Sequence, residues 1–128
     1  KILKGCHIYY DIMRNLGLKE DNDNKVLEYL QHTTVNQYSS GQKQRLGIIK
    51  LLYNMTEDHQ IIVFDEATNA LDNDTAKKVL CFISSFCQED VPRIVLFVSH
   101  QEELTRQITD RNITIVQNNF PKWEILMS

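Results

Sequence analysis

The spacing of apolar and polar positions predicts short helices in the first third of the chain. Apolar residues at helical intervals from Tyr9 to Leu16 predict a helix that ends at Gly17, because glycine is the usual residue just past a helix end. A polar run over 19–24 contains candidate helix N-caps, and a second short helix is expected around 26–30. Residues 1–37 are therefore expected to form a small helical lobe.

The remainder, 38–128, alternates helices with strands. An apolar stripe formed by Leu46, Ile49, Leu52 and Tyr53 predicts a helix over about 40–54. The runs 61–64 and 93–100 are short, continuous and rich in β-branched residues, which predicts strands buried on both faces in a parallel sheet. Further helices are expected over about 73–87 and 101–109, followed by a C-terminal hairpin. This order predicts an α/β fold with a mainly parallel sheet.

Composition narrows the class of protein. The 128 residues suit one domain or part of a larger one, with 42% hydrophobic and 24% charged residues. No apolar run is long enough to cross a membrane. The net charge of −3, with scattered Lys and Arg, argues against a nucleic-acid partner. Three cysteines without a CxxC pair predict reduced thiols, and the four histidines lack zinc-ligand spacing.

Polar side chains follow both predicted core strands. Asp65 and Glu66 come directly after the first strand, and His100 ends the second. In an open parallel sheet, ligands bind beyond the carboxyl ends of the strands. A single acid there is commonly a helix cap, and a single histidine is commonly a satisfied structural residue. Two adjacent acids beside a strand-end histidine favour a site instead, in which Asp65 could bind Mg²⁺ and Glu66 could polarise a water molecule.

A second candidate site lies at the start of the helix over 40–54. The sequence Ser39-Ser40-Gly41-Gln42 places small residues where a helix leaves free backbone N–H groups and the positive end of its dipole. Ordinary N-capping accounts for one serine. Glycine lowers helix stability at this position, so the group as a whole favours close approach of a phosphate.

These residues resemble motifs of the ATP-binding cassette (ABC) family. The segment 38–42 is similar to the signature motif, usually Leu-Ser-Gly-Gly-Gln, and 61–72 resembles a Walker B strand followed by a catalytic glutamate and a D-loop. The segment 95–100 ends in what resembles the switch histidine. The motifs follow the family's order, with 24 residues from Gly41 to Asp65 and 35 from Asp65 to His100. The resemblance implies a P-loop NTPase-like fold.

The resemblance also implies roles for individual residues. Asp65 would hold Mg²⁺ through water, Glu66 would polarise the attacking water, and His100 would contact the γ-phosphate of ATP. Residues of the signature-like segment would contact ATP held by a second nucleotide-binding domain in a head-to-tail dimer, and Asp72 would contact the same interface. The residues assigned to the nucleotide in this way are Ser39, Ser40, Gly41, Gln42 and Asp72.

The chain departs from the family pattern at several points. Tyr38, Ser40 and Asn69 stand where Leu, Gly and Ser are usual in the family. None of the four glycines begins a Walker A sequence, and no Q-loop can be assigned. The chain is therefore expected to be the C-terminal half of the domain and to hydrolyse ATP poorly by itself. A sheet without its Walker A strand would expose an edge and apolar surface, which predicts self-association.

Three functions fit this resemblance. The first is the ATPase domain of a transporter at the cytoplasmic face of a membrane, partnered by a transmembrane domain; Ala67 within 65–72 favours the exporter type. The second is a non-transport ABC ATPase of DNA repair or chromosome organisation, against which the lobe shows no sustained heptads. The third is a degenerate module without catalytic activity.

Overall fold

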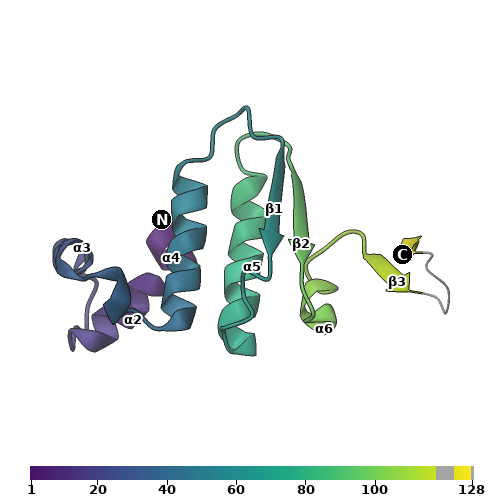
Figure 1. Cartoon of the computed structure of the whole chain (residues 1–128). Helices are drawn as coiled ribbons and strands as arrows, with labels where there is room; N and C mark the ends of the chain where they lie inside the picture. Colours follow the sequence, from purple (N-terminus) through teal and green to yellow (C-terminus); the bar gives the residue numbers. More distant parts are fainter. Residues whose placement is uncertain (118–122, 128) are drawn as a thin grey trace.

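The computed structural model describes residues 1–117 and 123–127 (Figure 1). Its helices and strands lie, in chain order, at α1 (Ile2–Gly5), α2 (Ile8–Asn15), α3 (Asp23–His32), the 3-10 turn η1 (Val35–Gln37), α4 (Ser40–Tyr53), β1 (Ile61–Asp65), α5 (Asn73–Cys87), β2 (Ile94–Val98), α6 (Glu102–Thr105), β3 (Ile113–Gln117) and β4 (Trp123–Met127). No described helix is both long and apolar enough to cross a bilayer.

The centre of the fold is a parallel pair of strands covered on one side by two helices. β1 pairs with β2 from Ile61 opposite Ile94 to Asp65 opposite Val98, and α5 makes the crossover between them. α4 and α5 run alongside the strands (Figure 1). Their inner faces pack with alternate residues of β1 in one buried cluster, which includes Ile48, Leu52, Ile62, Phe64, Val79, Leu80 and Ile83.

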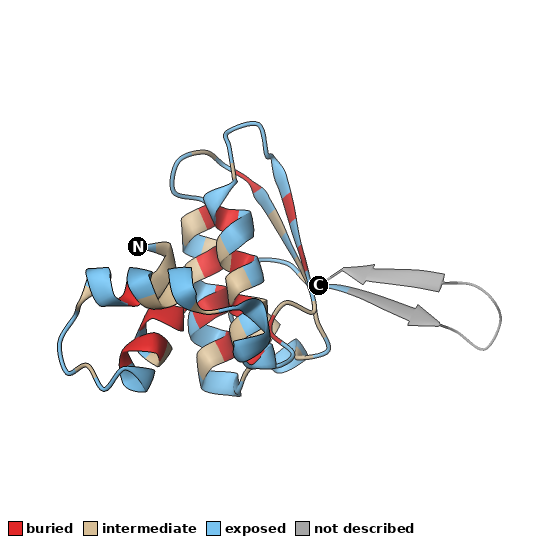
Figure 2. Ribbon diagram, turned by 60° about the vertical axis from the view of Figure 1, so that its left-hand side comes forward, coloured by how far each residue is buried: buried red, intermediate tan, exposed pale blue. Residues whose placement is uncertain are grey.

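The other face of this sheet is open, contrary to the expectation that both faces are buried. Burial alternates along β1 and β2, and every second residue of each strand is exposed (Figure 2), as expected when successive side chains point to opposite faces of a sheet. The outward residues keep between 43% and 60% of their surface exposed: Ile61, Val63, Ile94, Leu96 and Val98. A continuous apolar run identifies a strand that can be buried on both faces, but the layer that would cover this face is not among the described residues.

The helical lobe has its own apolar cluster, built from Ile8, Tyr9, Ile12, Met13 and Val26. Gly17 follows the C-cap of α2 with a φ of +66°, and Leu18 N–H donates to the Met13 carbonyl, as in a Schellman ending. The predicted helix end is therefore confirmed. Ile49 of α4 packs against both clusters and joins the lobe to the central layer.

The remaining elements differ in part from expectation. α5 matches the helix expected over about 73–87, whereas the helix expected over 101–109 is limited to α6. The C-terminal hairpin is confirmed as an antiparallel pairing of β3 with β4, and most of its predicted connection lies outside the described residues. Tyr53, expected on the apolar stripe of α4, is 80% exposed at the helix end.

Candidate functional site

The structure brings the acidic pair and the histidine together at the carboxyl ends of β1 and β2. His100 Nε2 lies 3.4 Å from Glu66 Oε1, with 96% of the histidine side chain and 30% of the glutamate side chain exposed. Asp65 is the last residue of β1 and is also exposed. All three side chains are therefore accessible at one end of the sheet, where a ligand of an open α/β fold binds.

The backbone of Glu66 adopts a conformation that is uncommon for a residue with a side chain. Its φ is +48°, in the left-handed region. The Glu66 N–H donates to the Val98 carbonyl at 2.9 Å, and the Glu66 carbonyl accepts from Asn69 N–H at 3.3 Å. The chain thus turns sharply at the end of β1 while this residue stays attached to β2. Strained backbone of this kind is concentrated at functional sites.

At the start of α4, local capping and internal packing account for much of the Ser-Ser-Gly-Gln sequence. Ser39 is the N-cap, and it exchanges hydrogen bonds with Gln42 in a capping box. Gly41 is buried, and a Cβ built on it would lie 2.9 Å from the Ala70 carbonyl oxygen. The absence of a side chain at Gly41 therefore allows close packing within this chain. The sequence pattern instead predicts that it allows close approach of a phosphate.

The same helix end retains groups that could meet an anion. Ser39 and Ser40 are exposed, and within the described residues the N–H groups of Ser40 and Gly41 donate to no acceptor. Free N–H groups at the start of a 14-residue helix attract negative charge. Capping and anion binding are thus compatible at this turn.

Asp72 has a local role in the structure. It is the N-cap of α5, and its Oδ1 accepts a hydrogen bond from Thr75 N–H at 3.0 Å. This hydrogen bond lowers the pKa of the Asp72 carboxyl below its usual value. The Asp72 residue is nevertheless exposed.

Two residues that link the candidate sites were not identified from the sequence. Gln44 of α4 donates to the Glu66 carbonyl and accepts from Ala70 N–H, so it joins the signature-like helix to the loop after β1. Thr68, only 3% exposed, donates to Gln101 at 3.4 Å and connects the same loop to the start of α6. Both contacts join segments distant in sequence, and no local motif indicates them.

The described residues do not form a complete metal site by themselves, since no group of three potential His, Cys, Asp or Glu ligands occurs among them. Mg²⁺ at nucleotide sites is commonly held by one or two carboxylates, with phosphate and water oxygens as the other ligands. The single exposed carboxylate of Asp65 fits that arrangement. A phosphate ligand would be needed to complete it.

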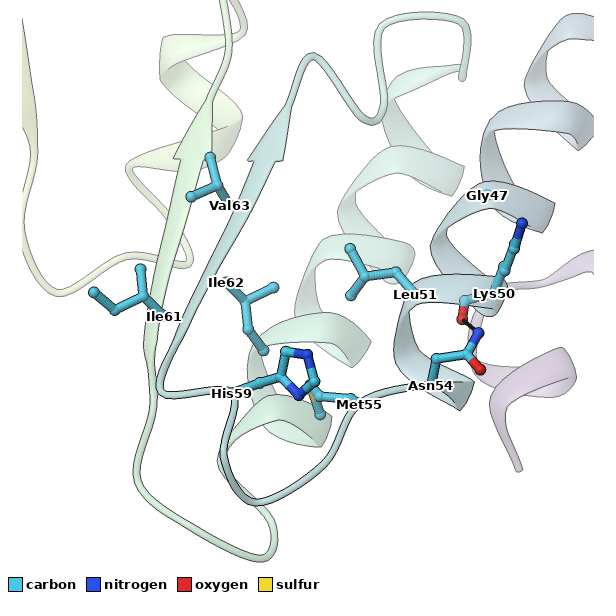
Figure 3. Close-up of a pocket in the computed structure, with 9 residues that line it drawn as sticks. All are labelled: Gly47, Lys50, Leu51, Asn54, Met55, His59, Ile61, Ile62 and Val63. Carbon is cyan, nitrogen blue, oxygen red and sulfur yellow. Dashed lines mark hydrogen bonds between the residues drawn. The ribbon is translucent and has the colours of Figure 1, made fainter.

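A hollow of about 450 Å³ lies away from these residues (Figure 3). It is formed by the second half of α4, the segment that follows it and the first residues of β1, including Leu51, His59 and Ile61. Ile61 and Asp65 are at opposite ends of β1, so the hollow is not part of the candidate site. Its lining is largely apolar and continues onto the open face of the sheet through Val63.

Parallel strands joined by a helix, with accessible acids and a histidine at their carboxyl ends, place the chain in the class of α/β proteins that bind ligands at this edge of a sheet. Comparisons with known proteins are more specific, although no family model matches the chain. The methionine import ATP-binding protein MetN of Bordetella avium is 38% identical over 85 residues, covering 66% of this chain and 22% of the relative. MetN of Streptococcus pyogenes serotype M3 (strain MGAS315) is 30% identical over 108 residues, covering 78% and 29%.

The chain belongs to the ATP-binding cassette family and corresponds to part of its nucleotide-binding domain. It spans less than a third of the length of the relatives that it matches. Family membership confirms the resemblance drawn from the signature-like, Walker B-like and switch-like segments. The expectation of an exporter is not supported, because both relatives are import proteins.

Proposed function

We propose that this chain supplies the signature turn, the magnesium-binding aspartate and the catalytic glutamate of an ABC ATPase that drives transport across a membrane. The observation that carries the proposal is the placement of Glu66 against His100 at 3.4 Å, beside Asp65, at the carboxyl ends of paired parallel strands. This arrangement occurs in a chain whose relatives are ATP-binding proteins. Residues 1–37 form the helical lobe in this proposal, and 38–128 belong to the ATPase core.

Each side chain has a defined chemical task. Glu66 accepts a proton from the attacking water, which requires an ionised carboxylate within hydrogen-bond reach of that water. Bound ATP with Mg²⁺ supplies the phosphoryl group and the charge that stabilises its transfer. Asp65 would help to hold Mg²⁺ through a water molecule. His100 donates from Nε2 to a phosphate oxygen, and its exposed side chain can turn from Glu66 without breaking other described contacts.

The start of α4 faces a different nucleotide in this proposal. Ser39 and Ser40 are exposed, and the free N–H groups of the first turn point out from the helix end. They would contact ATP held by a second nucleotide-binding domain, arranged head to tail. Asp72 would lie in the same interface. A transmembrane partner would contact the helical lobe, which places the assembly at the cytoplasmic face of a membrane.

The experiment joins a Walker A-bearing segment of the Bordetella relative to residues 1–128 and measures ATP hydrolysis. Glu66→Gln should reduce kcat by at least about 100-fold, as expected for loss of a general base. Glu103→Gln, an exposed acid on α6, is the matched control and should leave kcat unchanged. Residues 1–128 alone should show no hydrolysis, because most phosphate contacts of such ATPases come from the Walker A loop.

Other outcomes would support the alternative functions. Equal turnover in Glu66→Gln and the unsubstituted polypeptide would refute catalysis by this residue and favour a degenerate module. Stimulation of hydrolysis by DNA, without any stimulation by a transmembrane partner, would favour the non-transport ABC ATPases.

A further inference from the structure

One side chain of α4 holds the loop that contains the candidate catalytic glutamate. Gln44 Nε2 donates to the Glu66 carbonyl at 3.3 Å and also to Asn69 Oδ1, and Gln44 Oε1 accepts from Ala70 N–H at 3.0 Å. A side-chain amide has two N–H donors and an acceptor oxygen. Gln44 uses both kinds of group on a single loop.

The loop needs support at this point because Glu66 is strained. A residue with a side chain at a φ of +48° is stable only where its surroundings impose that conformation. On one side, Glu66 N–H is bonded to Val98 of β2 at 2.9 Å. On the other side, its carbonyl is bonded to Gln44 and to Asn69. This conformation carries the Glu66 carboxylate to within 3.4 Å of His100.

The same helix contacts the loop a second time. Gly41, one turn before Gln44, lies so close to Ala70 that an added Cβ would be 2.9 Å from the Ala70 carbonyl oxygen. The first turn of α4 and the loop over 66–70 are thus joined by both side-chain hydrogen bonds and backbone packing. A displacement of that first turn would move the backbone of Glu66.

We propose that Gln44 is a positioning residue that sets the backbone conformation of Glu66 and thereby aims its carboxylate at the attacking water. The proposal rests on the proposed function, since it assigns a catalytic role to Glu66. Gln44 itself touches no reacting atom. Its effect on turnover therefore comes from the geometry of Glu66 and leaves the binding of nucleotide largely unchanged.

The first test measures hydrolysis by the Walker A-joined polypeptide. Gln44→Ala removes all the bonds to the loop and should lower kcat by about 10- to 100-fold, the size of effect expected from a misplaced catalytic group, with KM changed less than about twofold. Lys43→Ala, an exposed neighbour on α4, is the matched control and should change neither constant. A rise in KM with kcat unchanged would overturn the proposal.

The pH profile of Gln44→Glu separates positioning from simple loss of stability. The ionised carboxylate cannot donate to the Glu66 carbonyl, whereas the protonated form has one O–H donor. The ratio of kcat in Gln44→Glu to that in the unsubstituted polypeptide should therefore rise as the pH falls from 8 to 5. A ratio that stays constant across this range would overturn the proposal.

A final readout does not depend on hydrolysis. In residues 1–128 alone, amide hydrogen exchange of Ala70 should become at least about fivefold faster in Gln44→Ala, because the bond that protects this amide is lost. Unchanged exchange would overturn the inference even if hydrolysis falls. If exchange rises but Glu66→Gln hydrolyses ATP normally, the loop is held as described and the proposed function has failed.

Discussion

The ion pair between Arg45 and Asp11 joins the helical lobe to α4, and its removal should have unequal effects on stability. Arg45 Nη2 contacts Asp11 Oδ2, with side-chain exposures of 7% and 22% respectively. Arg45 Nε also donates to the Gly41 carbonyl at 3.3 Å. A buried charge that loses its partner costs more than a charge that water can reach.

The magnitudes follow from these exposures. Asp11→Ala leaves the buried guanidinium without its counter-ion and should lower the free energy of unfolding by about 3 kcal/mol. Arg45→Met removes the buried charge and keeps apolar volume, so it should cost only about 1–2 kcal/mol while water hydrates Asp11. The double variant should cost at least about 1 kcal/mol less than the sum of the single variants, because the two groups interact directly.

Urea denaturation followed by far-UV circular dichroism measures these differences, provided that the m-value is unchanged. Arg106→Met is the control, because Arg106 pairs with Glu102 at 3.7 Å on the exposed surface of α6 and such pairs contribute at most about 1 kcal/mol. If the cost of the double variant equals the sum of the two single costs to within about 0.3 kcal/mol, the coupling between Arg45 and Asp11 is refuted. A larger cost for Arg45→Met than for Asp11→Ala would refute the assignment of Arg45 as the more strongly desolvated partner.

Three further predictions test other parts of the structure. In thermal unfolding, Gly41→Ala should lower the free energy of unfolding by about 1–3 kcal/mol, because the added methyl group clashes with the loop after β1. Gly47→Ala adds a methyl group that meets no atom within 4 Å and should stabilise α4 by about 0.5–1 kcal/mol. Equal effects of the two substitutions would contradict the packing of Gly41. Because the pKa of Asp72 is lower in the folded state, its charge stabilises the fold above the ordinary carboxyl value of 3.8 and this contribution disappears as the pH falls below it. The difference in melting temperature between the unsubstituted chain and Asp72→Asn should therefore shrink between pH 5 and pH 2, and a constant difference would contradict the cap. A thiol reagent should modify only exposed Cys81 before unfolding and all three cysteines after it, because burial raises the pKa of Cys6 to about 12; modification of two thiols in the folded chain would be the contrary result.

Local signals predicted much of the chain correctly. The helix expected over about 73–87 matches the observed limits of α5, and the end of α2 follows from Gly17. The helix expected over 101–109 ends at Thr105 instead. Beyond it, Gln107 N–H and Ile108 N–H donate to the carbonyls three residues back, those of Leu104 and Thr105, so the chain continues as tight turns.

Other features depend on tertiary contacts that no sequence pattern contains. The runs that form β1 and β2 identify strands, but they do not say which faces other segments cover. The exposure of Val63 and Leu96 could therefore not be predicted from the sequence. The self-association expected from such an apolar face stays a prediction. The role of Gln44 is similarly hidden, since an amide in the middle of a helix looks like an ordinary surface residue until the loop beside it is known.

Arg93 joins the segments at the amino ends of the two central strands. Its buried side chain donates to the carbonyls of Thr56, His59 and Cys87, and so ties together the end of α5 and the segment before β1. These bonds lie at the end of the strands opposite Glu66. A single buried guanidinium thus cross-links the segments at the amino ends of both strands, and backbone amides at this end are expected to be well protected from hydrogen exchange.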